Sequence, residues 1–342
     1  MNVLILDRKE TFVKLVGRIS EDDNYTFVTN IDFQKIDTYL LSIDLVLSIS
    51  YDNQSYNYVI QESKNKGILT GLLIDGPLEW SNSFINNTLR KNNIDKLYQP
   101  IIHDLVYCIS NSQLEYLKFV NSEKQFFTYK NNRIVLNSNI EKLDTNIDFL
   151  VTTANTSYFN KEEQYRLYKI LENLINYLEQ SNYSYETRFF DNEFKKLTKK
   201  NNISDSIEEH INSAKCIICT PSSVILSAMS KNKPVAQLIY RDSPLYYQSG
   251  WMIYSDDFFN ETLASMYQKD SDRMKYQSFE VIKNISLNII DLKKIQLLNQ
   301  QEEKPFNYSE CVFALNTLKA ILDSKWNFNL KYYVKKIIGL TK

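Results

Sequence analysis

Three hydroxyl side chains, those of Thr220, Ser222 and Ser223, have the spacing in this chain that most strongly suggests chemistry. The surrounding pattern predicts a helix over 221–230, with Thr220 as its N-cap and Pro221 at its first position. Backbone N–H groups at a helix start, the positive end of the helix dipole and nearby hydroxyls all favour an anion. Helix capping alone would explain one of these hydroxyls but not the whole run. We therefore predict that this turn binds a phosphate group.

Further polar side chains are expected to reach the same turn from the following strand. Apolar runs at 216–219 and 235–240 predict two buried strands on either side of the helix. Ligands of open α/β sheets bind at the carboxyl ends of the strands, where the second strand would deliver Tyr240, Arg241 and Asp242. Arg241 would neutralise a phosphate there, and its alternative role is a surface ion pair with Asp242.

The elements that must position these groups alternate between strand and helix, which predicts βαβ units and mostly parallel sheets. Further strands are predicted at 2–7, 43–50, 68–75, 105–110, 148–153 and 185–190, and helices at 54–66, 112–120, 161–180 and 206–214. The pattern restarts after a polar segment at 137–146. We therefore predict an α/β fold of two Rossmann-like αβα domains over 1–140 and 147–290, followed by a helical extension over 291–342.

Composition limits the class of protein. A chain of 342 residues with 43% hydrophobic and 24% charged residues is long enough for about two soluble domains. Its net charge of −1 provides no overall attraction to nucleic acid. Two histidines and four cysteines favour neither a multi-histidine metal site nor a disulfide framework, and Cys216 and Cys219 are expected to be core thiols. The chain contains no glycine-rich dinucleotide motif and no P-loop, which argues against those two enzyme classes.

The stretch CTPSSVILSAMSKNKPVAQLIYRD, residues 219–242, resembles the donor-binding motif of GT-B glycosyltransferases that build bacterial surface polysaccharides such as capsule, O-antigen and lipopolysaccharide. In that family a hydroxyl-Pro-Ser-hydroxyl turn leads into a helix and then into a strand that starts with Gly-Lys-Pro-Val. The upstream stretch DFLVTTANTSYF is similar to the first loop of the second GT-B domain, and it contains Thr152, Thr153 and Asn155. The resemblance implies two domains that face a cleft, with a nucleotide-sugar donor bound by these residues of the second domain.

Two positions depart from the family pattern. Ser227 stands where many GT-B enzymes carry a glutamate that holds the donor ribose, and Asn232 replaces the glycine of the Gly-Lys-Pro-Val start. The first departure puts the usual ribose contact in doubt. Both departures favour an alternative to catalysis, in which the chain is a GT-B-like scaffold of a polysaccharide assembly complex.

The resemblance assigns the acceptor to the first domain, where a base must take a proton from the acceptor hydroxyl. Asp75 ends the predicted strand 68–75 and is the first candidate for this base, with Glu79 second and His103 third. The sequence at Asp75 reads Asp-Gly-Pro, so a simple turn residue is the alternative.

These residues together predict an enzyme, a glycosyltransferase that moves a sugar from a nucleotide-activated donor to a hydroxyl of a growing glycan or lipid-linked glycan. No metal or cofactor is expected, because the chain lacks a clean Asp-x-Asp element and Arg241, the hydroxyls and the helix start can stabilise a leaving phosphate. A CDP-polyol phosphotransferase-like enzyme is the second interpretation, and a sugar-nucleotide epimerase is the third.

A cytoplasmic location is expected, because no signal peptide is recognisable and no apolar run reaches the ~18 residues that span a bilayer. The stretch 325–342 is basic and amphipathic. It is expected either to lie on the inner face of the membrane or to pack back on the protein.

Overall fold

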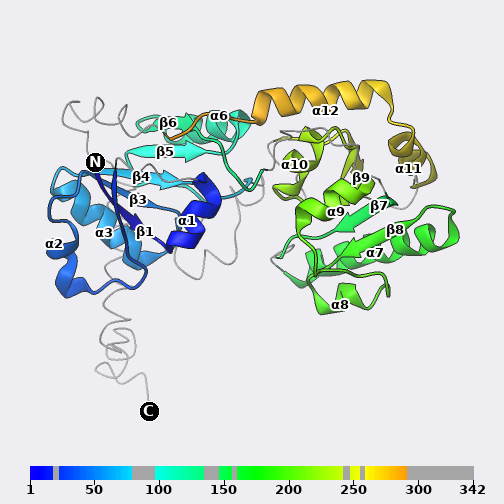
Figure 1. Ribbon diagram of the computed structural model, residues 1–342, viewed down its shortest axis with the longest axis horizontal. Helices are drawn as coiled ribbons and strands as arrows, with labels where there is room; N and C mark the ends of the chain where they lie inside the picture. The colour runs from blue at the N-terminus through cyan, green and yellow to red at the C-terminus, as the bar shows by residue number, and fades with distance from the viewer. Residues whose placement is uncertain are drawn as a thin grey trace, which may run out of the picture.

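The structure of the protein is a computed structural model, which describes residues 1–17, 23–78, 97–134, 146–155, 160–241, 247–254 and 259–290. These residues form two α/β units, each built around its own parallel sheet (Figure 1). The predicted fold class, two Rossmann-like α/β domains, is therefore confirmed.

The first unit has a six-stranded sheet in the order β2-β1-β3-β4-β5-β6. Its strands are β1 (Asn2–Leu6), β2 (Asn24–Phe27), β3 (Leu45–Ser48), β4 (Leu69–Leu73), β5 (Leu105–Cys108) and β6 (Gln125–Thr128). Its helices are α1 (Lys9–Val16), α2 (Ile36–Tyr39), α3 (Gln54–Asn65) and α6 (Asn111–Val120), with a 3₁₀ helix at Phe33–Lys35. The strands β3, β4 and β5 are buried along their whole length, as expected of central parallel strands that have helices on both faces.

The second unit has a five-stranded sheet in the order β11-β10-β9-β7-β8. Its strands are β7 (Ile147–Thr152), β8 (Tyr185–Arg188), β9 (Ala214–Cys219), β10 (Val235–Leu238) and β11 (Trp251–Ile253). Its helices are α7 (Lys161–Gln180), α8 (Asn192–Lys195), α9 (Ile207–Ser213), α10 (Val224–Ser230), α11 (Phe259–Tyr267) and α12 (Ser271–Asn284). Helix α7 covers the range predicted for it, because Asn160 Oδ1 caps it by accepting from the Glu163 N–H (2.9 Å).

The strands that the sequence did not predict are β2, β6 and β11. All three are edge strands of their sheets. An edge strand has one neighbour and a partly solvated face, so its apolar pattern is weaker than that of a central strand. In β2, for example, exposed and half-buried residues alternate over only four positions.

Apolar contact continues from one unit to the other. One cluster of buried side chains contains Val3, Leu47 and Tyr129 of the first unit together with Ile217 and Ile225 of the second. Two further clusters lie within the first and the second unit, respectively. The carboxyl ends of the strands in both sheets face the boundary between the units (Figure 1).

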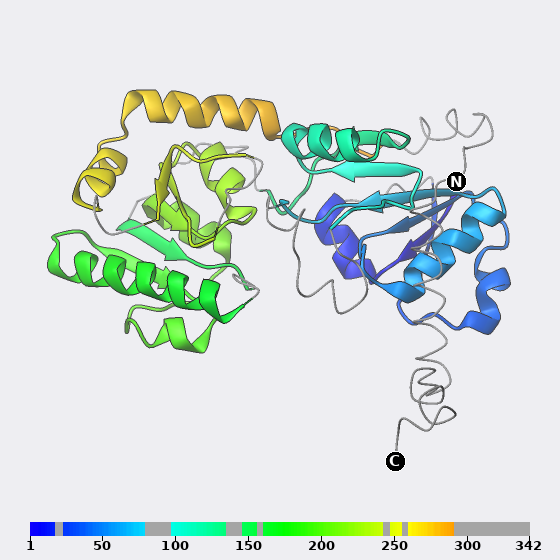
Figure 2. The ribbon, with the colours of Figure 1, turned by 180° about the vertical axis from the view of Figure 1, so that it is seen from behind.

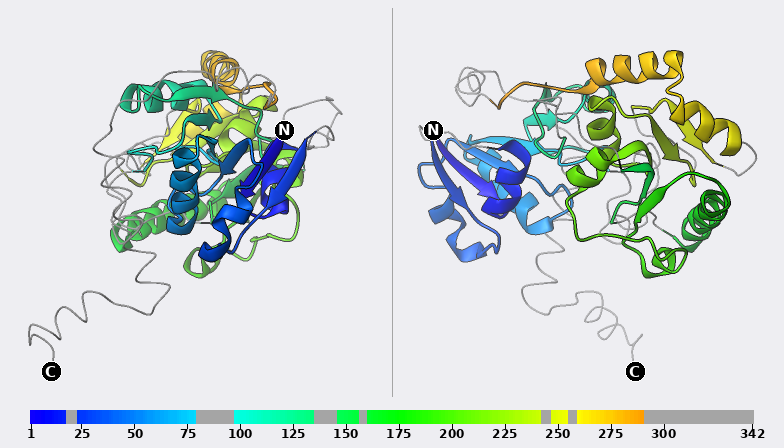
Figure 3. Two further views of the ribbon diagram at one scale, coloured as in Figure 1. Left: turned by 90° about the vertical axis from the view of Figure 1, so that its left-hand side faces the viewer. Right: turned by 45° about the vertical axis from the view of Figure 1, so that its right-hand side comes forward.

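Helix α12 leads from the second unit back to the first, and Figures 1 and 2 show it running toward α6. At the start of α6, Asn111 Nδ2 donates to the carbonyl oxygen of Lys283 (2.7 Å), and the Ser112 N–H donates to Asn284 Oδ1 (3.1 Å). Beyond α12 the chain passes β6, as the oblique view in Figure 3 also shows. There the Lys130 N–H donates to the carbonyl oxygen of Asn288 (2.7 Å). The two units are thus joined by α12 as well as by the shared apolar cluster.

The predicted domain limits, 1–140, 147–290 and 291–342, remain predictions, because residues 135–145 and 291–342 lie outside the described residues. The amphipathic stretch 325–342 is among them. Within the described ranges, no helix combines the length and the apolar character needed to cross a membrane.

Candidate functional site

The turn after β9, residues 220–223, is called the hydroxyl turn below. Thr220 Oγ1 accepts from the Ala154 N–H (2.7 Å), and the Thr220 N–H donates to the carbonyl oxygen of Thr152 (3.1 Å). Thr220 has no exposed surface. It therefore ties the carboxyl ends of β7 and β9 together. The prediction that Thr220 caps the following helix was wrong, because the helix begins later and Ser223 is at its N-cap position.

Helix α10 begins at Val224, three residues later than predicted, and Ser223 occupies its N-cap position without a side-chain capping bond. Pro221 therefore lies in the turn and not at the first helical position. Both Ser222 and Ser223 keep part of their surface exposed. Their hydroxyls are thus the members of the hydroxyl turn that a ligand can reach.

The other predicted donor-side residues divide into buried and exposed ones. Thr152 and Thr153 are buried, and Thr152 Oγ1 lies 3.2 Å from the carbonyl oxygen of Arg188, to which it can donate. Thr153 Oγ1 has no hydrogen-bond partner among the described residues. Asn155 is exposed at the loop after β7. The two threonines therefore belong to the packed end of the sheet, and Asn155 is the member of this loop that solvent can reach.

At the end of β10, Arg241 lies against its neighbour. Arg241 Nη2 donates to the Tyr240 hydroxyl (2.8 Å), and its guanidinium carbon stands 5.0 Å from the centre of the Tyr240 ring. Both side chains are buried. Asp242 lies outside the described residues, so the predicted ion pair between Arg241 and Asp242 remains a prediction.

On the first sheet, Asp75 lies in the turn after β4, residues 74–78, which is called the Asp75 turn below. Arg133 Nη1 donates to Asp75 Oδ2 (2.9 Å) and to the carbonyl oxygen of Asp75 (3.4 Å). Asn131 Nδ2 donates to the same carbonyl oxygen (3.2 Å), and the Tyr129 hydroxyl donates to that of Ile74 (2.8 Å). The side chain of Asp75 is 45% exposed and that of Arg133 is 30% exposed, so the carboxylate can still meet a ligand.

Arg133 was not predicted from the sequence. It belongs to the loop after β6, residues 129–134, which is called the β6 loop below, and β6 is itself one of the edge strands that the sequence pattern did not indicate. The one available signal is its charge, because Arg133 is a basic residue seven positions before the predicted end of the first domain at 140. That signal does not connect it with Asp75, which lies 58 positions earlier.

Ser227, on α10, brings the two turns together. Its Oγ lies 3.2 Å from the carbonyl oxygen of Ser223 and 3.4 Å from that of Arg133, and the two carbonyls compete for its one proton. The side chain is almost fully buried. The hydroxyl turn, the β6 loop and the Asp75 turn therefore meet at one place, which is called the junction below. At this position the chain has a contact between units where the family pattern has a ribose-binding glutamate.

The second departure, Asn232, has a simple backbone reason. Asn232 has a φ of 55°, in the left-handed region that glycine and asparagine adopt most readily. Its N–H donates to the carbonyl oxygen of Met229 (2.9 Å), and the Lys233 N–H donates to that of Ala228 (3.1 Å). This pair of bonds is a Schellman motif, which ends α10 and turns the chain into β10. Asparagine here keeps the backbone geometry for which the family uses glycine.

Of the other candidates for the base, His103 does not join the junction. His103 precedes β5 and has no exposed surface, and its Nε2 lies 2.8 Å from Ser48 Oγ. Burial lowers the pKa of His103 to about 3, although the Asp104 carboxylate acts in the opposite direction. In this conformation the buried imidazole ring cannot contact an acceptor substrate. Glu79 lies outside the described residues.

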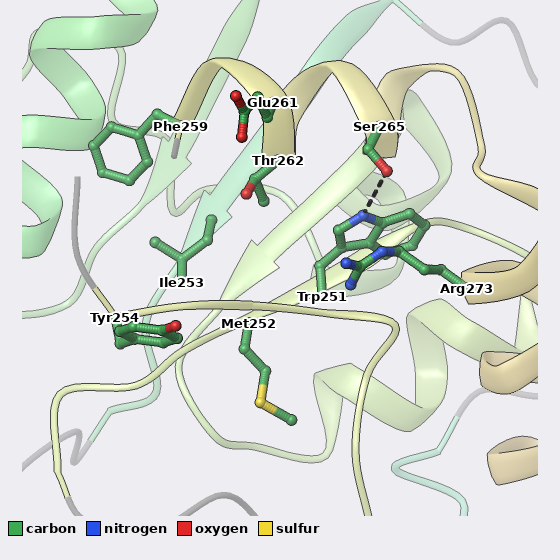
Figure 4. Close-up of a pocket in the computed structure, with 9 residues that line it drawn as sticks. All are labelled: Trp251, Met252, Ile253, Tyr254, Phe259, Glu261, Thr262, Ser265 and Arg273. Carbon is green, nitrogen blue, oxygen red and sulfur yellow. Dashed lines mark hydrogen bonds between the residues drawn. The ribbon is translucent and has the colours of Figure 1, made fainter. Parts of the chain in front are cut away.

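A separate pocket of ≈ 370 Å³ lies between β11 and α11 (Figure 4). Its lining includes Trp251, Glu261 and Arg273, and the Trp251 indole N–H donates to Ser265 Oγ (3.1 Å). None of the predicted site residues lines it. The pocket is at the outer edge strand, which β10 separates from β9 and the hydroxyl turn.

The described cysteines are buried free thiols, as expected for Cys216 and Cys219. Burial raises the pKa of both thiols. Among the described residues, no group of three or more His, Cys, Asp or Glu side chains is placed to hold a metal ion.

No protein-family model and no curated protein sequence matches this chain. Its fold is similar to that of S. aureus MnaA, solved with UDP, at 12% identity and a TM-score of 0.52, over 90% of this chain and 99% of that one. It is also similar to the UDP-GlcNAc 2-epimerase of Neisseria meningitidis bound to UDP-GlcNAc, at 12% identity and a TM-score of 0.52, over 87% and 99% of the two chains.

A third solved structure is the pneumococcal O-GlcNAc transferase GtfA in complex with UDP and GlcNAc. It matches at 12% identity and a TM-score of 0.47, over 75% of this chain and 56% of that one. The fold assignment rests on the first two structures, whose TM-scores are higher. The chain thus has the two-domain GT-B fold that its donor-side motif resembles.

Proposed function

We propose that this protein is a glycosyltransferase that moves a sugar from a nucleotide-activated donor to a hydroxyl of a bacterial surface glycan. The observation that carries the proposal is the junction. There the hydroxyl turn and a half-exposed carboxylate, on the carboxyl edges of two different sheets, are linked through Ser227 and Arg133. Ligands of open α/β sheets bind at such edges.

The chemistry would be a direct displacement at the anomeric carbon. The acceptor oxygen forms a bond to that carbon while the bond from the carbon to the donor phosphate oxygen breaks, and its electron pair leaves with the nucleotide. Asp75, as the carboxylate with exposed surface at the junction, would take the acceptor proton. Ser222 and Ser223 would donate hydrogen bonds to the leaving phosphate, supported by Arg241.

A UDP-sugar is the first donor to test. Two solved structures of the same fold were captured with UDP and with UDP-GlcNAc, which supports this choice of nucleotide. A growing or lipid-linked glycan as acceptor, independence from metal, and a cytoplasmic site with peripheral membrane contact through 325–342 belong to the same proposal.

The testing experiment combines binding with turnover. Thermal unfolding is followed with UDP, GDP, CDP, CMP and dTDP and their sugars, with and without EDTA, and transfer to glycan acceptors is then measured. A ligand that binds only the native protein raises the melting temperature by mass action. We expect one nucleotide family to do so regardless of EDTA, and acceptor-dependent release of that nucleotide.

Variants locate the donor site. The double variant Ser222→Ala, Ser223→Ala is expected to weaken nucleotide binding about tenfold, because it removes hydroxyl groups that would donate hydrogen bonds to the charged phosphate. Arg241→Ala is expected to act in the same direction. Ser230→Ala, in the last position of the same helix, is the matched control. Unchanged affinity and turnover in all the site variants would refute the proposed site, and binding without transfer to any acceptor would favour the scaffold interpretation.

The second candidate is a sugar-nucleotide epimerase. The observation that favours it is the match to an epimerase over 99% of that enzyme's length. Incubation with UDP-GlcNAc alone, followed by NMR, separates the two activities. A new hexosamine isomer or free UDP in the absence of acceptor would select the epimerase, whereas a transferase leaves UDP-GlcNAc intact until an acceptor is added.

A further inference from the structure

The β6 loop lies between the Asp75 turn, which the proposed function assigns to the acceptor side, and α10, which it assigns to the donor side. On one side it contacts the Asp75 turn through three side chains, those of Tyr129, Asn131 and Arg133. On the other side the carbonyl oxygen of Arg133 lies 3.4 Å from Ser227 Oγ on α10. A single residue, Arg133, thus touches both the carboxylate and the helix that follows the hydroxyl turn.

The β6 loop is held firmly by its own bonds. Asn131 Oδ1 accepts from the Arg133 N–H (2.9 Å), and the Ile134 N–H donates to the carbonyl oxygen of Asn131 (2.9 Å). The Asn132 N–H donates to the carbonyl oxygen of Leu15 at the end of α1 (2.8 Å). These bonds hold the backbone of Arg133 to Asn131, so a shift of α10 against the Arg133 carbonyl would be passed to the backbone from which its guanidinium extends.

Gly17 explains how the β6 loop fits against α1. It has a φ of +82°, and a Cβ at this position would stand 2.1 Å from Asn132 Nδ2. The backbone conformation at this position therefore requires glycine, and the exposed Asn132 side chain lies against it. The β6 loop is seated on α1 at this point, which leaves its Arg133 end to contact α10.

We infer that Arg133 is a positioning residue that couples α10 on the second unit to Asp75 on the first. The inference rests on the proposed function, in which α10 belongs to the donor side and Asp75 to the acceptor side. Donor binding that moves α10 would then set the direction of the Asp75 carboxylate, so that the base is aligned when the donor is in place. Ser227 occupies the position of the family glutamate and makes the contact that this coupling needs.

Amide hydrogen exchange tests the coupling without any turnover. Ser227→Ala removes the contact with Arg133 and touches no residue of the Asp75 turn, yet it is expected to speed exchange in residues 74–78 about two- to thirtyfold. Ser230→Ala is the control, because Ser230 Oγ donates to the carbonyl oxygen of Ser227 (2.8 Å) within the same helix. Unchanged exchange at residues 74–78 in Ser227→Ala would overturn the inference.

Kinetics with UDP-GlcNAc and a glycan acceptor provide the second readout. Arg133→Gln is expected to lower kcat about ten- to a hundredfold with little change in the KM for the donor, because a misdirected base affects chemistry more than binding. Millimolar guanidinium is expected to restore part of the kcat of Arg133→Gln, whereas a loss of folding would not be rescued. Arg166→Gln, which removes an exposed arginine paired with Glu162 on α7, is the matched control.

The two proposals fail separately. If the wild-type chain transfers no sugar, the proposed function is lost, and amide exchange in Ser227→Ala alone decides the coupling. If transfer occurs but Arg133→Gln has wild-type kcat, the inference is lost and the proposed function stands.

Discussion

Asp75 and Thr220 both follow a buried strand of a parallel sheet, and both lie in turns that meet at the junction, yet their surroundings differ. The Asp75 side chain is 45% exposed and its partner Arg133 is 30% exposed. Thr220 is completely buried, and its oxygen accepts a bond from the backbone of Ala154. The Asp75 turn thus presents a charged side chain to solvent, whereas the Thr220 side chain accepts a hydrogen bond from a backbone N–H group.

This difference in exposure distinguishes residues that stabilise the folded site from residues whose side chains can contact a ligand there. A buried hydroxyl that satisfies a backbone N–H contributes to stability, because that donor would otherwise lose its partner. A half-exposed carboxylate contributes little to stability through its surface ion pair but can exchange a proton with a ligand. Under the proposed function, Thr152, Thr153 and Thr220 would support the site, and Asp75, Ser222 and Ser223 would carry its chemistry.

The largest effect is expected from Asp75→Asn. If Asp75 is the base, the variant should lower kcat by about 10²- to 10⁴-fold, while thermal stability stays close to that of the wild type. Steady-state rates with UDP-GlcNAc and a glycan acceptor, together with the melting temperature, check both parts. Asp44→Asn, on an exposed residue just before β3, is the matched control. A fully active Asp75→Asn enzyme would show that Asp75 is not the base.

Thr220→Val tests the other side of the comparison. It leaves the part-buried Ala154 N–H without its acceptor, so the free energy of unfolding should fall by about 1 kcal/mol. Thr220→Ser retains the oxygen and should recover most of that loss. Urea unfolding of the three proteins measures this. A stable Thr220→Val protein with weakened nucleotide binding would instead make Thr220 a ligand-binding residue.

His103 provides a further test, because it is a buried titratable group just before β5, in the unit that contains Asp75. Burial lowers its pKa to about 3, whereas an unfolded histidine has a pKa near 6.5. The unfolded state therefore binds the proton first as the pH falls below about 6.5, and stability should decline by up to about 1.4 kcal/mol per pH unit.

Urea unfolding between about pH 7.5 and 5.5 measures this slope in a range where carboxylates stay largely ionised. His103→Gln should show a smaller slope. Equal slopes in the wild type and His103→Gln would mean that His103 is not buried in its neutral form.

The smallest effect concerns Asn232. Its positive φ suits asparagine and glycine, so Asn232→Ala should lower the free energy of unfolding by about 1 kcal/mol, and Asn232→Gly should be close to neutral. The same urea series measures both variants. A neutral Asn232→Ala would show that the left-handed conformation at the end of α10 is not required.

The position of a residue just after a strand was predicted correctly where the strand itself had a strong apolar pattern. Asp75 and the hydroxyl turn follow β4 and β9, whose buried runs are visible in the sequence. Arg133 was missed because it follows β6, an edge strand with only half-buried residues. The role of Thr220 was misjudged because its local pattern fits a helix cap equally well, and the competing Ala154 N–H lies 66 positions away.

The amino-acid sequence alone was enough to predict the alternation of strands and helices, the places where polar residues follow buried strands, and a stretch that resembles a GT-B donor-binding motif. These features depend on periodicity and turn chemistry within a few residues, which any local window contains. The folded structure was needed to show that Arg133 pairs with Asp75, that Ser227 contacts the Arg133 carbonyl and that Thr220 bonds to Ala154. Those pairings depend on how two sheets and α10 pack together, and hydrogen-bond donors and acceptors choose among partners only after that packing has placed them within reach.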